Sequence, residues 1–130
     1  MNQISVLIVV DTEGAIASHS LKDNVYCVDN EGYLGSWQEG TNSLRTICKD
    51  GQQISWSVTS INATDSVSLV KFDGQMLTSH VCKPEKVSAL GEVHWVGQVQ
   101  SRGQFASFTY SCTLQFEGKS MSFSAAIKVV

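Results

Sequence analysis

The chain has 130 residues, near the usual size of one domain, and a compact fold of that length buries enough surface to form a core without metal or disulfide support. With 42% hydrophobic residues, 16% charged residues and a net charge of −3, the composition excludes a disordered chain. It also argues against a nucleic-acid binder, which would need clustered Lys and Arg, and against binding to an anionic membrane. The whole chain, 1–130, is predicted to be one globular domain.

The first element expected is a buried strand from Ile4 to Val10, because this apolar stretch is far shorter than the roughly 20 residues that cross a membrane. No basic segment precedes it, and Asp11 and Glu13 follow where a signal peptide would carry small residues. We therefore expect no signal peptide and a cytoplasmic protein. The next residues, Glu13–Ser20, are compatible with one helical turn.

Alternation of apolar and polar residues with a period of two marks the later strands. They are expected at Val25–Val28, Ser43–Cys48, Gln53–Val58, Ser66–Phe72, Gln75–Ser79, Val93–Val99, Phe108–Phe116 and Met121–Val129. Asp50-Gly51 and Asp73-Gly74 favour tight hairpin turns, and Glu117-Gly118-Lys119 favours a third near the C-terminus. A second helical turn is compatible with Glu85–Leu90.

This pattern predicts an all-β fold, an antiparallel β-sandwich of about eight or nine strands. Trp56 and Trp95 fall on the apolar side of the alternation and are expected in the core. The charge-poor segment Phe105–Phe116 is expected to lie at a poorly protected sheet edge. Together with the low net charge, this edge predicts a homo-oligomer.

The four cysteines lie far apart in the sequence, with no CxxC pair of the kind that zinc sites use: Cys27, Cys48, Cys82 and Cys112. An even count allows two disulfides, but without a signal peptide we expect buried, reduced thiols. His80 and Cys82 are a candidate catalytic dyad, yet nothing near them supplies the positive surroundings that a thiolate needs. Since phosphate-binding loops and the GxSxG motif are absent as well, the chain is predicted not to be an enzyme.

Oxygen-bearing side chains follow the first strand and precede the second. Asp11, Asp23 and Asn24 supply the carboxylate and amide oxygens that calcium prefers, so one hypothesis is a calcium site at these residues. The alternative is that they form ordinary turns, in which such side chains bind nearby backbone groups.

Two aromatic residues lie among glycines and polar residues just beyond these turns. Exposed rings of Tyr33 and Trp37 would stack on the apolar face of a sugar, while Asp23 and Asn24 would bind its hydroxyl groups. A glycan-binding hypothesis therefore assigns the ligand to these four residues. The alternative is that Trp37 caps one end of the core.

Five segments, taken in order, carry a resemblance that covers essentially the whole chain: Ile4–Ala15, Asp23–Tyr26, Asp50–Val58, Val93–Gly97 and Ser122–Val129. They are similar to the inclusion-body protein family of Gram-negative bacteria, the PixA/AidA family, and to its shorter AidA-like branch in particular. The resemblance implies an abundant intracellular protein, crystalline inclusions in host-associated bacteria and density-dependent expression, with no enzyme activity.

The resemblance and the residues together predict a non-enzymatic binding protein that recognises glycans or a host surface in the manner of a lectin. The alternative is a self-assembling inclusion or storage protein without a small-molecule ligand. PixA-type members are rich in methionine, whereas this chain has three Met, which weakens the storage role.

Overall fold

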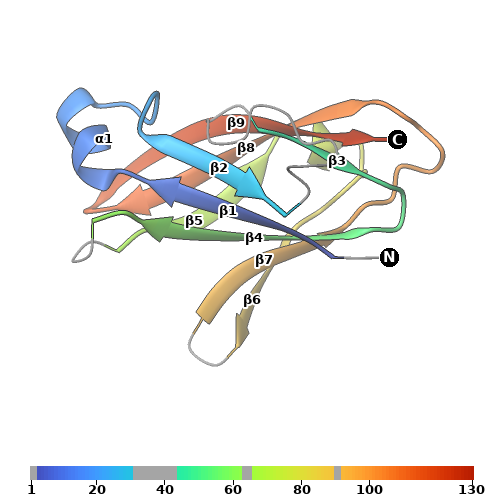
Figure 1. The fold of residues 1–130 in the computed structure, drawn as a ribbon, viewed down its shortest axis with the longest axis horizontal. Coiled ribbons are helices and arrows are strands. Elements are labelled where there is room, and N and C mark those ends of the chain that lie inside the picture. The colour runs from blue at the N-terminus through green and yellow to red at the C-terminus, as the bar shows by residue number, and fades with distance from the viewer. Residues whose placement is uncertain (1–2, 31–43, 63–65, 90–91) are drawn as a thin grey trace.

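The computed structural model describes residues 3–30, 44–62, 66–89 and 92–130 and arranges them as two β-sheets packed face to face (Figure 1). The described strands of the first sheet are, in spatial order, β2 (Val25–Asp29), β1 (Ile4–Val10), β4 (Gln53–Ser60), β7 (Glu92–Gln98) and β6 (Glu85–Ala89). Those of the second are β3 (Arg45–Cys48), β9 (Lys119–Val129), β8 (Ser107–Phe116) and β5 (Ser68–Asp73). The described helices are α1 (Thr12–Ser18), which agrees with the helical turn predicted there, and α2 (Gln75–Thr78). The predicted all-β sandwich is confirmed.

Both sheets are mixed, whereas the sequence predicted antiparallel pairing throughout. β1 runs parallel to β4, with Val6 opposite Trp56, and β3 runs parallel to β9, with Thr46 opposite Ile127. Parallel neighbours need a long crossover connection. Periodicity within a strand says nothing about which distant strand lies beside it, so this part of the prediction was wrong.

The core lies between the sheets and takes its side chains from both of them. Alternate residues of β1 point inward and are buried, while Ser5 and Leu7 point outward. Trp56 of β4 is fully buried, and its ring meets Phe72 of β5 and Tyr110 of β8 edge-on, with centroids 5.1 and 5.8 Å apart. Since Trp56 belongs to one sheet and its two partners to the other, this aromatic cluster joins the layers.

The β8–β9 hairpin agrees with the sequence prediction in its strands and in its turn. Ten residue pairs link the two strands, from Ser107 opposite Lys128 to Phe116 opposite Lys119. Glu117 and Gly118 both have positive φ, as a two-residue hairpin turn requires.

The Asp50-Gly51 turn does not join a hairpin, which corrects the prediction. β3 and β4, on either side of it, lie in different sheets, so the turn carries the chain across the sandwich. Asp50 accepts a hydrogen bond from the backbone N–H of Ser101 at 2.8 Å, and the Gly51 N–H donates to the Val99 carbonyl at 2.7 Å. Contacts with a distant segment therefore fix the path of the chain here.

Gln75–Thr78 forms helix α2 rather than the strand predicted over Gln75–Ser79. Gly74 precedes it with φ 109° and ψ −175°, a conformation that almost only glycine adopts, and turns the chain out of β5. Met76 is fully buried, and the Ser79 hydroxyl donates to the Gln75 carbonyl at 2.6 Å. The burial of Met76 and the hydrogen bond between Ser79 and Gln75 stabilise a helical turn here in place of the predicted hairpin.

Two corrections concern the sheet edges. Glu85–Ala89, which was expected to belong to a helical turn, is strand β6, because it pairs along its whole length with β7. The segment predicted at an edge, Phe105–Phe116, contributes β8, which lies inside its sheet between β9 and β5. The edges of the described sheets are instead β2 and β6 in one and β3 and β5 in the other. Within the described ranges, no helix is long and apolar enough to cross a membrane.

Candidate functional site

The structure brings two of the predicted site residues, Asp11 and Asn24, together at the start of α1. Asp11 is the N-cap of this helix, and its Oδ1 accepts a hydrogen bond from the Gly14 N–H at 3.0 Å. Its own backbone N–H donates to the Asn24 carbonyl at 2.8 Å. Asp11 Oδ2 and Asn24 Oδ1 both lie so close to Gly14 that a Cβ atom there would collide with them.

The side chain of Asn24 binds the chain that leads into β2. Its amide nitrogen lies 3.1 Å from the Ser18 hydroxyl and 3.1 Å from the carbonyl oxygens of Ser20 and Lys22. Asp23, the neighbouring residue, is exposed and has φ 65°. The contacts of Asp11 and Asn24 are those of ordinary turns that hold a helix end against a strand.

The calcium and glycan hypotheses stay predictions at these residues. Tyr33 and Trp37 lie outside the described residues. Among the residues that the structure describes, no group of three or more His, Cys, Asp or Glu is placed to hold a metal ion.

The cysteines are buried free thiols, in agreement with the prediction. Burial raises the pKa of Cys27, Cys48 and Cys82 to about 12, and the charges of Asp50 and of Cys48 add to the rise at Cys48 and Cys82 respectively. A nucleophilic thiol needs the opposite shift. The candidate dyad lacks its geometry as well, because His80 is exposed whereas the Cys82 sulfur packs against Gly97.

A cleft of about 270 Å³ lies where β4, β5 and β7 meet, and sequence reasoning did not anticipate it. Its lining is mixed: the hydroxyl groups of Ser57 and Ser68 lie among six apolar side chains, Trp56, Val58, Val67, Leu69, Val93 and Trp95. The Trp95 indole N–H donates to the Leu69 carbonyl at 3.1 Å, which fixes one wall. Lys86 of β6 lines the cleft too and gives it a positive charge. The cleft forms because the second sheet ends at β5 while the first continues through β7 to β6.

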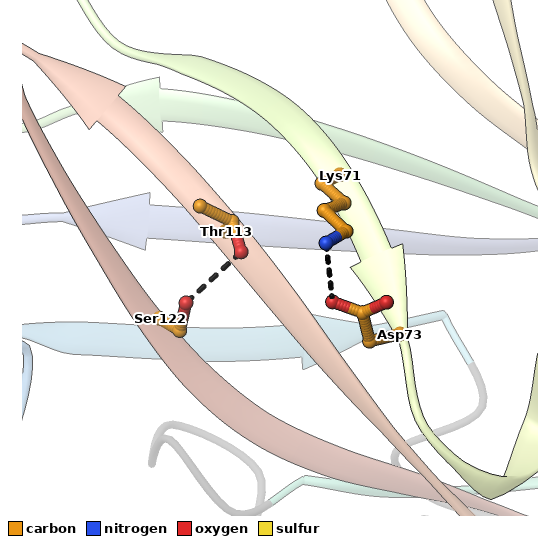
Figure 2. Close-up of polar contacts among 4 residues, drawn as sticks. All are labelled: Lys71, Asp73, Thr113 and Ser122. Carbon is orange, nitrogen blue, oxygen red and sulfur yellow. Dashed lines mark hydrogen bonds and ion pairs between the residues drawn. The ribbon is translucent and has the colours of Figure 1, made fainter.

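Part of the outer surface differs in chemistry between the two sheets. On β8 and β9, hydroxyl groups face one another across the strands, with Ser111 and Ser124 3.1 Å apart. Thr113 and Ser122 are 2.9 Å apart (Figure 2). We call these four residues the hydroxyl face. Its hydroxyl groups form hydrogen bonds with one another, and the surface they make is polar and suited to contact with water.

On β1 and β2 most of the outward side chains are apolar, Ser5 being polar. Leu7 lies opposite Val28, and Val9 lies opposite Tyr26. Leu7 is 37% exposed and Tyr26 41% exposed, while Val9 and Val28 are half-buried. We call these four residues the apolar face. The register makes it a continuous patch rather than a set of scattered side chains.

The two sides of the sandwich also differ. On one side, edge strands β2 and β3 are linked by a buried hydrogen bond, in which the Thr46 hydroxyl donates to Asp29 at 2.8 Å. On the other side, the hairpin of β6 and β7 extends away from the rest of the molecule (Figure 1). Glu85, Lys86, Val87 and Ser88 of its edge strand are all exposed.

Comparison with known proteins identifies the family. Residues 2–122 match the family described as Domain of unknown function (DUF8788), and the chain belongs to this family. No curated protein matches the chain. Among solved structures it is similar to the crystal structure of the inclusion body protein PixA from Burkholderia cenocepacia J2315, with a TM-score of 0.79 and 14% identity over 99% of this chain and 96% of that chain. The resemblance to the PixA/AidA family is thus confirmed in the fold, while the AidA-like branch stays a prediction.

Proposed function

From this family membership and this fold, we propose that the protein is a non-enzymatic, self-associating protein of the inclusion-body type that acts in the cytoplasm. The observation that carries the proposal is the contrast between the hydroxyl face and the apolar face. The hydroxyl face has polar groups that bind one another, whereas the apolar face exposes Leu7 and Tyr26 to water. A continuous exposed apolar patch is a feature of protein contact surfaces.

Two further observations support this proposal. Buried free thiols suit a reducing compartment, and their raised pKa values suit packing rather than catalysis. The solved structure that shares this fold is named as an inclusion body protein. An assembling role needs neither a cofactor nor a substrate pocket.

Sedimentation velocity over a wide range of protein concentrations tests the proposal. The wild-type protein should form species larger than a dimer, and Leu7→Glu should make the largest species smaller because it places a charge in the apolar face. Thr109→Glu is the matched control, since Thr109 is exposed on the outer surface of β8. A wild-type protein that stays monomeric at the highest concentration would refute the proposal.

A second candidate function is the binding of a small ligand, and the cleft beside Trp95 favours it. Ligand pockets usually have volumes of roughly 300–1,000 Å³, so about 270 Å³ suits a small molecule. The lining combines apolar side chains, two serine hydroxyl groups and Lys86, and these suit a short chain that ends in an anionic group. Octanoate should therefore change the tryptophan fluorescence at lower concentration than octanol, and Lys86→Met should remove that difference. Equal responses to the two compounds in the wild-type protein would exclude an anion-selective cleft.

A further inference from the structure

The exposed strand edge β6 is built differently from edge β5, on the same side of the sandwich. β5 has an irregular register between Leu69 and Lys71, and Lys71 pairs with Asp73 at 3.3 Å along the strand (Figure 2). Bulges and charges of this kind keep a strand edge from pairing with another chain. β6 also carries charges, at Glu85 and Lys86, but it has neither a register shift nor an internal proline, and it keeps one regular register with β7 from Glu85 to Ala89.

We propose that two copies of this chain pair antiparallel through β6, about a twofold axis at Val87, and join their five-stranded sheets into one of ten strands. This inference rests on the proposed self-association and names one of its contacts. The edge carries unpaired backbone groups, which a second copy can satisfy by adding its own strand. Val87, at the centre of the strand, is 38% exposed in the single chain.

Symmetry and charge select the register. In a twofold antiparallel pair, each residue lies opposite one from the partner that points to the same side of the sheet. An axis at Val87 places Val87 opposite the partner's Val87 and Lys86 opposite the partner's Ser88. An axis at Lys86 or at Glu85 would instead place two like charges directly opposite one another, which is unfavourable. The Val87 register also uses all five residues of the strand and keeps Pro84, which has no N–H to donate, outside the ladder.

The pairing closes on itself. Because both copies use the same edge, the contact yields a dimer and not a fibre. Five residues a side form a small contact, below the roughly 1,200 Å² of total buried area that stable interfaces reach, so we expect a micromolar dissociation constant.

Cross-linking at the axis tests the register directly. Side chains directly opposite in an antiparallel pair have Cβ atoms about 4.5–5.5 Å apart, close to the spacing of a disulfide. With oxidised glutathione as the oxidant, two Val87→Cys chains should form one disulfide and release two molecules of reduced glutathione. The native cysteines are buried and should not take part. Val70→Cys is the matched control, since Val70 is on edge β5 and 41% exposed.

We expect a covalent dimer on a non-reducing gel for Val87→Cys and much less for Val70→Cys. Equal cross-linking of the two variants, or none in either, would overturn the Val87 register. The comparison of the two cysteine variants does not depend on larger assemblies, because the gel separates only covalently linked chains and so reports the dimer alone.

A charge at the axis provides the second test, in the Leu7→Glu background that weakens the apolar face. Adding Val87→Lys should turn the dimer into a monomer in sedimentation, with at least a ten-fold rise in the dissociation constant. Val93→Lys should leave the dimer intact, because Val93 is on β7 and opposite Ser88, so it points to the other surface of the sheet than Val87. If the Leu7→Glu protein still dimerises with Val87→Lys, this inference fails while the proposed function stands. If the wild-type protein never self-associates, both fail.

Discussion

Replacing Gly74 with alanine should strongly destabilise the fold, because this glycine joins β5 to α2 in a backbone conformation that residues with a Cβ atom rarely adopt. Its φ of 109° and ψ of −175° cost a residue with a Cβ atom about 1–3 kcal/mol. The new Cβ would also lie 2.9 Å from the Thr109 carbonyl oxygen and 2.9 Å from the Tyr110 Cα. Both atoms belong to the backbone of β8, which is held between β9 and β5, so the strand or the helix must shift at a further cost of about 1–3 kcal/mol.

The summed loss is about 2–6 kcal/mol, against the roughly 5–15 kcal/mol by which a domain is usually stable. Gly103→Ala and Gly118→Ala separate the two contributions. Both glycines have positive φ, 84° and 73°, but an added Cβ would meet no atom within 4 Å. Each control should therefore lose only the backbone cost of about 1–2 kcal/mol.

Urea unfolding followed by tryptophan fluorescence measures these differences, since Trp56 and Trp95 both pack in or against the core. The midpoint for Gly74→Ala should lie clearly below the midpoints of both controls, with the same dependence on urea. If all three variants unfold together, the contact with β8 contributes nothing and the reasoning is refuted.

Three further predictions follow from the burial, the cap and the aromatic residues. Raising the pH from 9 toward 12 should lower the free energy of unfolding. In the unfolded chain thiols ionise near their ordinary pKa of 9.0, whereas burial keeps the thiols of Cys27, Cys48 and Cys82 protonated in the folded chain up to a pH of about 12. Urea midpoints that do not change with pH would contradict this. Asp11→Ala should cost about 1 kcal/mol through loss of the α1 N-cap, with or without calcium, and a calcium-dependent loss would favour the metal hypothesis instead. Under the glycan-binding hypothesis, Trp37→Ala should abolish the signal on a glycan array run with and without calcium, and should cost much less than the about 3–5 kcal/mol of a buried aromatic; a large loss of stability would place Trp37 in the core.

Sequence reasoning succeeded where the deciding interactions are local. The β8–β9 hairpin depends on alternation within each strand and on Glu117 and Gly118, which are adjacent in the chain. The same alternation placed Trp56 in the core. These features need no knowledge of distant segments.

Most of the failures involve contacts between distant segments. Asp50-Gly51 has the composition of a hairpin turn, but bonds to Val99 and Ser101 direct the chain into the other sheet. β6 has no marked alternation, and it is a strand because β7 pairs with it. The cleft beside Trp95 depends on where β5 ends a sheet, which strand order decides and periodicity does not. For the same reason the sequence placed a sheet edge on β8.

The twist of the proposed dimer determines how assembly continues beyond it. Seven steps separate β1 from the partner's β1 across the joined sheet, and neighbouring strands rotate by roughly 20–25°, so the two ends differ by roughly 140–175°. The two apolar faces of the dimer therefore point in nearly opposite directions. Each must contact a different neighbouring dimer, so the assembly extends at both ends. Leu7→Glu alone should leave dimers joined through β6, Val87→Lys alone should leave dimers joined through the apolar face, and the double variant should be a monomer. Sedimentation velocity distinguishes these species. Species larger than a dimer in either single variant would show that β6 and the apolar face are not the two contacts that build the assembly.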